Sequence, residues 1–184
     1  MKVLKLRRIG DPILRQPAKR LTKQEIASDK IQDLIKDIKC TCDSKDYGVG
    51  LSASQVGEPL AISVIAIKPT KNHPSAQPFE RTMINAEITE KFGDPIERWE
   101  GCISVGGPAA EDLIHGQVLR YKKVKVKYLD ENAQEQEEVF SGFMAHVAQH
   151  EVDHVNGVLF IDLADPKTLM MGDEYKKRII EERK

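Results

Sequence analysis

The segment His150-Glu151-Val152-Asp153-His154 carries the residues of this chain that are best suited to chemistry. Residues four apart lie on one face of an α-helix, so the imidazoles of His150 and His154 can point at one spot. Glu151 lies beside that spot, where a carboxylate can take a proton from water. Two imidazoles and one acid at this spacing predict a hydrolytic metal site. The alternative interpretation is an ordinary polar helix face.

A catalytic site of this kind needs a third protein ligand and an open position for water. The candidates are Cys102, His146, Glu174 and several aspartates. Cys102 follows Gly101 in the sequence EGCIS, and the glycine permits a close approach of the backbone. A thiolate binds borderline metal ions strongly, but a lone cysteine can equally be a small buried apolar residue. The residues alone therefore leave the third ligand open.

Helices must position these groups, and the hydrophobic pattern predicts three of them. The first covers residues 23–43, where four apolar residues form one stripe. The motif helix covers residues 143–156 and ends before Gly157, which is in the favoured position after a helix. A polar last helix covers about residues 166–182. The stripe of the first helix consists of Ile31, Leu34, Ile35 and Ile38.

The remaining segments predict strands and loops. Residues 60–67 form a largely buried strand, residues 82–89 a second one, and residues 123–128 a half-exposed strand that returns over residues 135–140. Residues 69–80 contain three prolines and form a loop. Strands precede one central helix and do not alternate with helices. The pattern therefore predicts an α+β fold with antiparallel or mixed sheets packed around a central metal-binding helix.

Composition limits the classes of function. With 184 residues, of which 40% are hydrophobic, the chain can form a single domain over residues 1–184. The net charge is −1, so no overall field favours DNA or a membrane, and no apolar run reaches the length of a membrane span. The first residues contain no apolar signal core, so a cytoplasmic protein is predicted. The three cysteines do not suggest a disulfide framework, and Cys40 and Cys42 are packing or surface residues of the first helix.

A second glycine-rich stretch, GVGLSASQVG at residues 48–57, lacks the Gly-Lys-Ser/Thr ending of a phosphate loop. Its small residues let the backbone approach a ligand closely. Gln55 could donate an amide hydrogen bond to a developing oxyanion. The alternative interpretation is a loop packed against a sheet.

Three segments together resemble the peptide deformylase family, which carries GxGLAAxQ, EGCLS and QHExDH in this order. They stand here as GVGLSASQ (48–55), EGCIS (100–104) and QHEVDH (149–154). The opening RRIGDPILRQPAKRL and the segment VNGVLFIDL after the metal helix are also similar to the family. The resemblance extends over nearly the whole chain.

The resemblance implies that Cys102, His150 and His154 bind one divalent metal ion, with Fe²⁺ as the native ion and Zn²⁺, Ni²⁺ or Co²⁺ as substitutes. It implies that Glu151 accepts the proton of the attacking water and later gives it to the departing amine. Gln55 and the backbone N–H of Ile103 would polarise the formyl oxygen. The expected reaction removes the N-formyl group from the formyl-methionine of new peptides and releases formate.

The resemblance also implies which residues contact the peptide. These are Gly48, Val49, Gly50, Glu100, Gly101, Phe143, His146 and Val147. Ser52 replaces the usual first alanine of the glycine motif, and Ile103 replaces leucine. The segment after Cys102 is longer than in the family's pattern. His115 falls where a peptide-holding arginine would be, and Arg120 fits a second basic position.

His146 precedes His150 by one helical turn, where the family usually has an apolar residue near the methionine pocket. It is interpreted as a histidine that is hydrogen-bonded at the pocket wall. The alternatives are a changed side-chain preference and, least favoured, a metal ligand in place of Cys102.

Two other functions remain open from the sequence. One is an HExxH metallopeptidase with Glu174 as third ligand. The other is a non-catalytic homologue that binds the ribosome or the nascent chain. Basic residues of the last helix make the ribosome a candidate partner, although a solvated face explains them as well. They are Lys176, Lys177, Arg178, Arg183 and Lys184.

Overall fold

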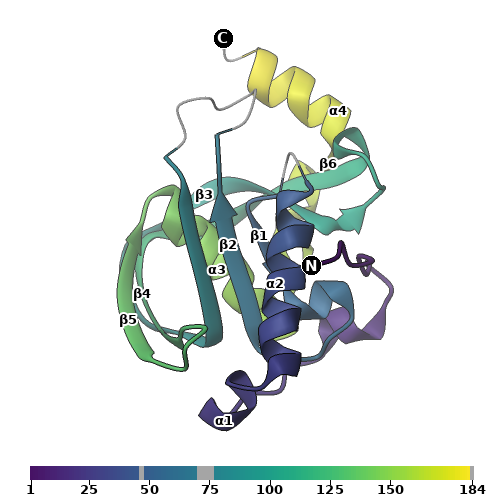
Figure 1. Cartoon of the computed structure of the whole chain (residues 1–184). Helices are drawn as coiled ribbons and strands as arrows, with labels where there is room; N and C mark the ends of the chain where they lie inside the picture. Colours follow the sequence, from purple (N-terminus) through teal and green to yellow (C-terminus); the bar gives the residue numbers. More distant parts are fainter. Residues whose placement is uncertain (46–47, 70–76, 183–184) are drawn as a thin grey trace.

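The computed structural model describes residues 1–45, 48–69 and 77–182. Six strands of these residues form one sheet, in which β3 and β4 are much longer than the others (Figure 1). The strands are β1 (Gly50–Ser52), β2 (Ile62–Ile67), β3 (Phe79–Gly106), β4 (Leu113–Leu129), β5 (Glu135–Ser141) and β6 (Met170–Met171). The helices are α1 (Lys23–Ile26), α2 (Asp29–Asp43), α3 (Phe143–Val155) and α4 (Gly172–Tyr175). Short 3-10 turns cover Pro12–Arg15, Ala53–Val56, Ala110–Asp112, Phe160–Asp162 and Pro166–Thr168, and a π-helical turn covers Lys176–Glu181.

The strands follow the order β1-β2-β3-β4-β5, with β6 beside β4, and these pairs are all antiparallel. This confirms the α+β prediction and the strands at residues 60–67 and 135–140. The strands predicted at 82–89 and 123–128 are only parts of β3 and β4. Register shifts after Ile84, Ile88 and Phe92 of β3 break the alternation by which a strand is detected in sequence. Of the predicted loop at 69–80, residues 70–76 lie outside the described part.

Strand β2 is buried on both faces. Ile62, Val64 and Ala66 pack in the cluster that includes the buried side chains of α2, whereas Ile65 and Ile67 pack in the cluster that includes those of α3. Side chains alternate across a strand, so the residues at positions 63, 65 and 67 belong to the α3 side. This position between two helices explains why residues 60–67 have an almost continuous apolar sequence.

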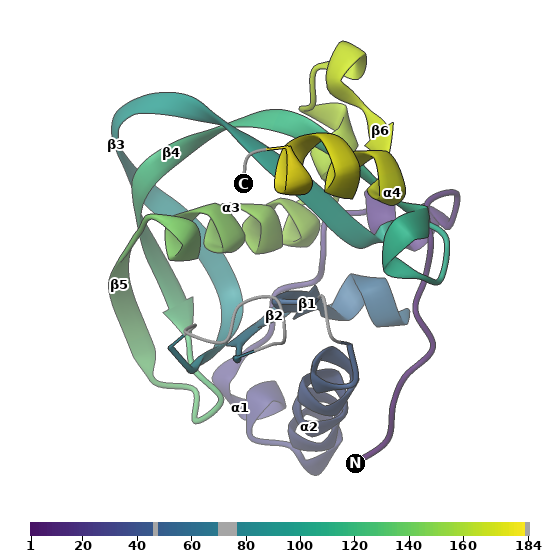
Figure 2. The same ribbon diagram turned by 90° about the horizontal axis from the view of Figure 1, so that it is seen from above.

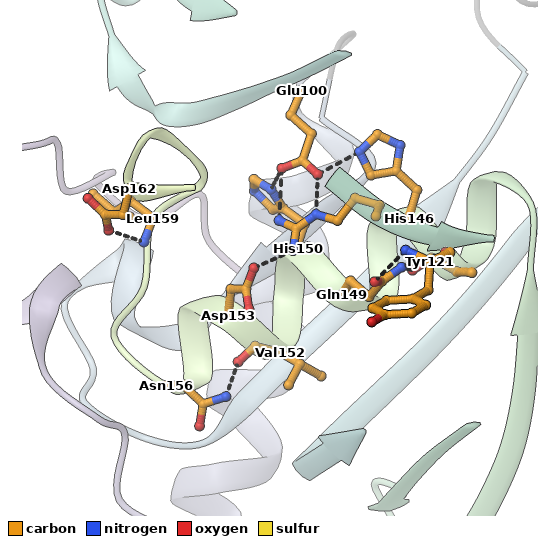
Figure 3. Close-up of polar contacts among 12 residues, drawn as sticks. Glu100, Tyr121, His146, Gln149, His150, Val152, Asp153, Asn156, Leu159 and Asp162 are labelled. Atoms are coloured by element: carbon orange, nitrogen blue, oxygen red, sulfur yellow. Dashed lines mark hydrogen bonds and ion pairs between the residues drawn. The ribbon is translucent and has the colours of Figure 1, made fainter. Parts of the chain in front are cut away.

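Helix α3 confirms the predicted motif helix. It contacts strands β1 to β5, and Figure 2 shows it running between β1 and β2 below and α4 above. Gln149 fixes it to β4, because its amide accepts from the backbone N–H of Tyr121 (3.0 Å) and donates to the Tyr121 carbonyl (2.9 Å) (Figure 3). The helix ends at Val155, and Gly157 adopts a φ of 74°, as expected for the residue after a helix.

The single helix predicted over residues 23–43 was wrong, because two helices occupy this segment. The side chains of Thr22 and Glu25 form a capping box around α1. Ser28 then adopts an extended conformation (φ −73°, ψ 145°) and begins α2. A serine that competes for backbone hydrogen bonds favours such a break. The apolar stripe survives in α2, where Ile31, Ile35 and Ile38 are buried.

The predicted last helix begins six residues later than expected. Residues 166–171 form a 3-10 turn and strand β6, whose Met170 and Met171 pair with β4. Gly172 then starts α4. A Cβ added at this position would lie 2.3 Å from the Ala110 carbonyl oxygen, so the helix starts at a point of close contact with another segment, which the polar pattern of the sequence does not indicate. The basic residues 183–184 lie outside the described part. None of the described helices is long and apolar enough to span a membrane.

Candidate metal centre

Three groups of the kind that bind metal ions meet between α3 and β3. The sulfur of Cys102 and one ring nitrogen each of His150 and His154 all lie within 4.8 Å of one another. The Cys102 Sγ is 3.3 Å from the His154 Nε2, and both residues are buried. The four-residue spacing places the two imidazole centroids 4.9 Å apart. A thiolate and two imidazoles suit a borderline divalent ion such as Fe²⁺ or Zn²⁺.

A bulge in β3 contributes the cysteine. Pairing with β4 runs up to Gly101–His115 and resumes only at Gly106–Leu113, so residues 102–105 face Ile114 alone. Such a bulge redirects side chains at functional sites. At Gly101 an added Cβ would lie 2.7 Å from the His115 Nε2, so the close approach expected of this glycine is confirmed.

Glu100 orients the histidines from behind (Figure 3). Its Oε2 accepts a hydrogen bond from the His150 Nδ1 (2.9 Å), and its Oε1 accepts one from the His146 Nε2 (2.7 Å). Because His150 donates through Nδ1, its Nε2 keeps the lone pair that a metal ion needs. The guanidinium of Arg120 bonds both oxygens of Glu100 and also Asp153.

The charges around the histidines favour a cation at this point. Burial opposes ionisation of Glu100, but hydrogen bonds from His146, His150 and Arg120 outweigh it and hold the pKa of this carboxyl far below its usual range. Burial lowers the pKa of His150. Cys102 and Glu100 raise this pKa by more than burial lowers it, so the net pKa is well above its usual value. Burial, followed by the charge of His150, lowers the pKa of His154. The donors and their surroundings thus fit a divalent metal ion.

Glu151 points from α3 toward β1. Its Oε2 accepts a hydrogen bond from the Ser52 Oγ (2.8 Å), and a Cβ added to Gly50 would lie 2.3 Å from its Oε1. A side chain at position 50 would therefore displace this carboxylate. Burial raises the pKa of Glu151 to about 7, while the charge of His150 and the bond from Ser52 act against this rise. A carboxyl near neutrality suits a group that must both accept and release a proton.

Gln55 lies in the 3-10 turn after β1 and is buried. Its Oε1 accepts a hydrogen bond from the backbone N–H of Ser52 (2.8 Å), which turns the amide nitrogen toward Cys102 (3.4 Å from Sγ) and Ser104 (3.1 Å from Oγ). Ile103 follows Cys102 on the bulge of β3. The structure thus brings the Gln55 amide next to the sulfur of Cys102, and Ile103 follows that residue in the chain.

Six of the eight residues predicted to contact the peptide are exposed or partly exposed. Gly48, Val49 and Gly50 are partly exposed, and Gly101 is exposed. Phe143 and His146 line a cavity of about 460 Å³. Its other walls are Glu97, Arg98, Trp99 and Gln117.

Two of the predicted peptide contacts are buried. Val147 is 5% exposed and packs in the core, and its contact with the peptide stays a prediction. Glu100 is 4% exposed and both of its oxygens are bonded, so its side chain orients His146 and His150, and its contact with the peptide also stays a prediction.

The two basic positions after Cys102 do not offer a peptide-holding cation. His115 stacks on Tyr175 at 4.2 Å with parallel rings, and burial lowers its pKa. Arg120, at the second basic position, is buried and pairs with Glu100 and Asp153. A buried guanidinium needs such acidic partners, and no pattern in the sequence predicted this pairing.

The other candidates for the third ligand lie elsewhere. Glu174 is 43% exposed and pairs with Arg178 on the surface. His146 points its Nε2 at Glu100, which confirms the interpretation of a hydrogen-bonded histidine. Cys42 is buried and Cys40 partly buried, as expected for packing residues of the helix.

Three residues of the site were not predicted to take part in it. Asp153 holds Arg120, and Ser52 and Ser63 contact Glu151 from β1 and β2. Ser52 was visible only as a mild departure from the glycine motif, and Ser63 only as the one polar residue in an apolar strand. The latter was the available signal, because a buried hydroxyl in a core strand needs a partner.

Comparison with known proteins finds relatives of this chain. The sequence model of the family described as polypeptide deformylase matches residues 3–169. The chain is 34% identical to peptide deformylase 2 of Nostoc sp. over 179 residues, which cover 97% of this chain and 95% of that protein. It is 36% identical to the peptide deformylase of Leptospira biflexa over 164 residues, covering 88% of each protein.

Solved structures agree with the sequence comparisons. The class I type b peptide deformylase of Acinetobacter baumannii, bound to Met-Ala-Ser, matches with a TM-score of 0.78 and 34% identity, over 88% of this chain and 98% of that one. A peptide deformylase of Synechococcus elongatus in complex with actinonin matches with a TM-score of 0.76 and 34% identity, over 95% of this chain and 85% of that one.

Proposed function

This chain belongs to the peptide deformylase family of metal-dependent amidohydrolases, and we propose that it hydrolyses the N-terminal formamide of formyl-methionyl peptides. Water adds to the formyl carbon, the carbon–nitrogen bond breaks, and the products are formate and a peptide with a free amino terminus. The observation that carries this proposal is the convergence of Cys102, His150 and His154 within 4.8 Å, with Glu151 next to the first histidine.

The three convergent residues would hold one divalent metal ion. When bound, the ion would supply Lewis-acid chemistry, polarising the formyl carbonyl and lowering the pKa of the attacking water. We propose Fe²⁺ as the native ion, because the family commonly uses ferrous iron, with Zn²⁺, Ni²⁺ or Co²⁺ able to replace it. Glu100 and Arg120 keep His150 in the orientation and tautomer that ligation requires.

Glu151 would act as general base and then as general acid. Its carboxylate takes a proton from the attacking water and returns it to the peptide nitrogen as that nitrogen leaves. The buried position excludes competing water, and Gly50 lets the carboxylate lie directly against β1.

Gln55 and Ile103 would stabilise the charge that develops on the formyl oxygen. The backbone N–H of Ser52 holds the Gln55 Oε1 and so keeps the amide nitrogen turned toward the ligand group, where one of its hydrogens would be donated to the formyl oxygen. The backbone N–H of Ile103 would supply the second donor from the bulge of β3.

The peptide would lie against Gly48, Val49, Gly50 and Gly101, with its first side chain directed at Phe143, His146 and Val147. N-formylated peptides arise during protein synthesis, so we place the enzyme in the cytoplasm. A ribosome contact through the end of the chain, including Lys176, Lys177 and Arg178, is part of the proposal. These residues follow α4 and are exposed.

The competing functions have less support. A metallopeptidase would use Glu174 as its third ligand, but that side chain pairs with Arg178 on the surface. A non-catalytic homologue would have no need of a base and an oriented amide beside the ligand group. We propose neither DNA binding nor membrane binding.

The decisive experiment is to measure formate release from formyl-Met-Ala-Ser by protein purified without oxygen, with the bound metal quantified in the same sample. Turnover that depends on one metal ion per chain would support the proposed function. Absence of turnover on formyl peptides at full metal occupancy would contradict it and favour the non-catalytic homologue.

We predict that His146→Leu raises kcat/KM for formyl-Met-Ala-Ser by about three- to tenfold, because an apolar wall suits a methionine side chain better than an imidazole. The same variant should lose activity on a peptide whose first residue is polar. Steady-state kinetics on both peptides test this, with metal content as the control for the lost bond to Glu100. An unchanged or lower kcat/KM for the methionyl peptide would count against a role in specificity.

A further inference from the structure

Ser52 has no assigned part in the reaction, yet it lies beside the proposed base. It belongs to β1 and is paired in register with Ser63 of β2. The two hydroxyl oxygens are 2.6 Å apart, and both residues are buried, with 1% and 0% of their surfaces exposed. Burying two hydroxyls on a strand face costs folding free energy unless their hydrogen bonds are satisfied. Here the partner is Glu151 of α3.

The hydrogen-bond directions follow from chemistry. An ionised carboxylate only accepts, so the Ser52 Oγ must donate its single hydrogen to the Glu151 Oε2, which is 2.8 Å away. Ser63 then donates to Ser52, and its oxygen also lies 3.3 Å from the Glu151 carbonyl. The two hydroxyls thus form a short chain that ends on one oxygen of Glu151.

The other oxygen of Glu151, Oε1, lies next to Gly50, which has no side chain to cover it. An added Cβ at Gly50 would come within 2.3 Å of Oε1, so the carboxylate is held between a glycine and a hydroxyl two residues apart on the same strand. The glycine motif of the family has alanine at the position of Ser52, and a methyl group cannot hold Oε2. In this chain the Ser52 hydroxyl therefore orients the carboxylate, in addition to the contact with Gly50.

We propose that Ser52 is a positioning residue for Glu151, which it holds by Oε2 so that Oε1 receives the proton of the attacking water. Ser63 keeps Ser52 in the donating orientation. The inference rests on the proposed function, in which Glu151 is the base. Ser52 acts through Glu151 and needs no contact with the substrate.

The test compares Ser52→Ala, Ser52→Thr and Ser54→Ala. Ser54 is a matched control, because its buried hydroxyl has no hydrogen-bond partner within the described part of the chain. Ser52→Ala is expected to lower kcat about tenfold, a typical cost for one bond to a charged group, with KM within about twofold. Ser52→Thr keeps the hydroxyl and is expected to recover most of kcat, whereas Ser54→Ala leaves it unchanged. Bound metal should match the wild type throughout.

A second measurement separates positioning from general packing. In a Glu151→Gln background, Ser52→Ala should cause no further loss of the residual rate, because the group it positions is gone. The inference is overturned if Ser52→Ala retains full kcat, if KM rises in parallel, if threonine does no better than alanine, or if the two losses multiply. Failure of the proposed function looks different, since the wild type itself would then release no formate.

Discussion

Replacing Glu151 by glutamine is expected to lower kcat for formyl-Met-Ala-Ser by a factor of about 10² to 10⁴, the range that general acid–base catalysis contributes. Glutamine has almost the same shape and can still accept a hydrogen bond from Ser52, but its amide cannot take a proton from water. The substitution also removes a buried carboxyl from the base of the site without adding volume. Steady-state formate release, measured together with bound metal, gives the result.

The control for this variant is Glu174→Gln, which makes the same chemical change on the surface, where Glu174 pairs with Arg178. It should keep wild-type turnover. Metal content must stay equal in all three proteins, because Glu151 is proposed as the base and not as a ligand. Turnover within tenfold of the wild type in a metal-loaded Glu151→Gln protein would refute the role of this carboxylate.

Loss of the metal ion is the expected result of Cys102→Ser. A serine hydroxyl stays protonated near neutral pH and is a much poorer ligand than a thiolate for borderline ions. Changing a group that only supports a ligand costs 10- to 100-fold in metal affinity, so removing the ligand itself should cost more than about 100-fold. Turnover should fall to background at metal concentrations that saturate the wild type.

Cys42→Ser is the matched control, because this cysteine is also buried but lies in α2 and does not belong to the ligand group. It can destabilise the fold by placing a hydroxyl in the core, but metal binding per folded molecule should not change. Competition with a chelator measures the affinities. If Cys102→Ser binds metal as tightly as the wild type and Glu174→Gln does not, the metallopeptidase interpretation would replace the one proposed here.

The orientation of His150 depends on charges that balance one another. Glu100 receives bonds from two histidines and from Arg120, and Arg120 in turn reaches Asp153 on α3. A buried pair of this kind contributes little net stability, but it fixes geometry, because a broken pair would leave a buried charge without a partner. Glu100, which was expected to contact the peptide, thus orients a proposed metal ligand.

The sequence by itself determined the features that depend on short spacing. Helix periodicity places His150, Glu151 and His154 together, and a glycine at position 157 ends the helix. Both were predictable because residues four apart are neighbours in any α-helix, whatever surrounds it. The resemblance of three ordered motifs then selected Cys102 from ligand candidates that the residues alone had left open.

Only the tertiary structure decided what depends on pairing between distant segments. The bulge that carries Cys102 and Ile103 exists because β3 and β4 lose register between Gly101 and Gly106. The register of β1 with β2 sets Ser52 opposite Ser63, and packing of α3 on that face sets both against Glu151. Strand register and helix packing are fixed by contacts across the whole core, and one strand's sequence does not contain them.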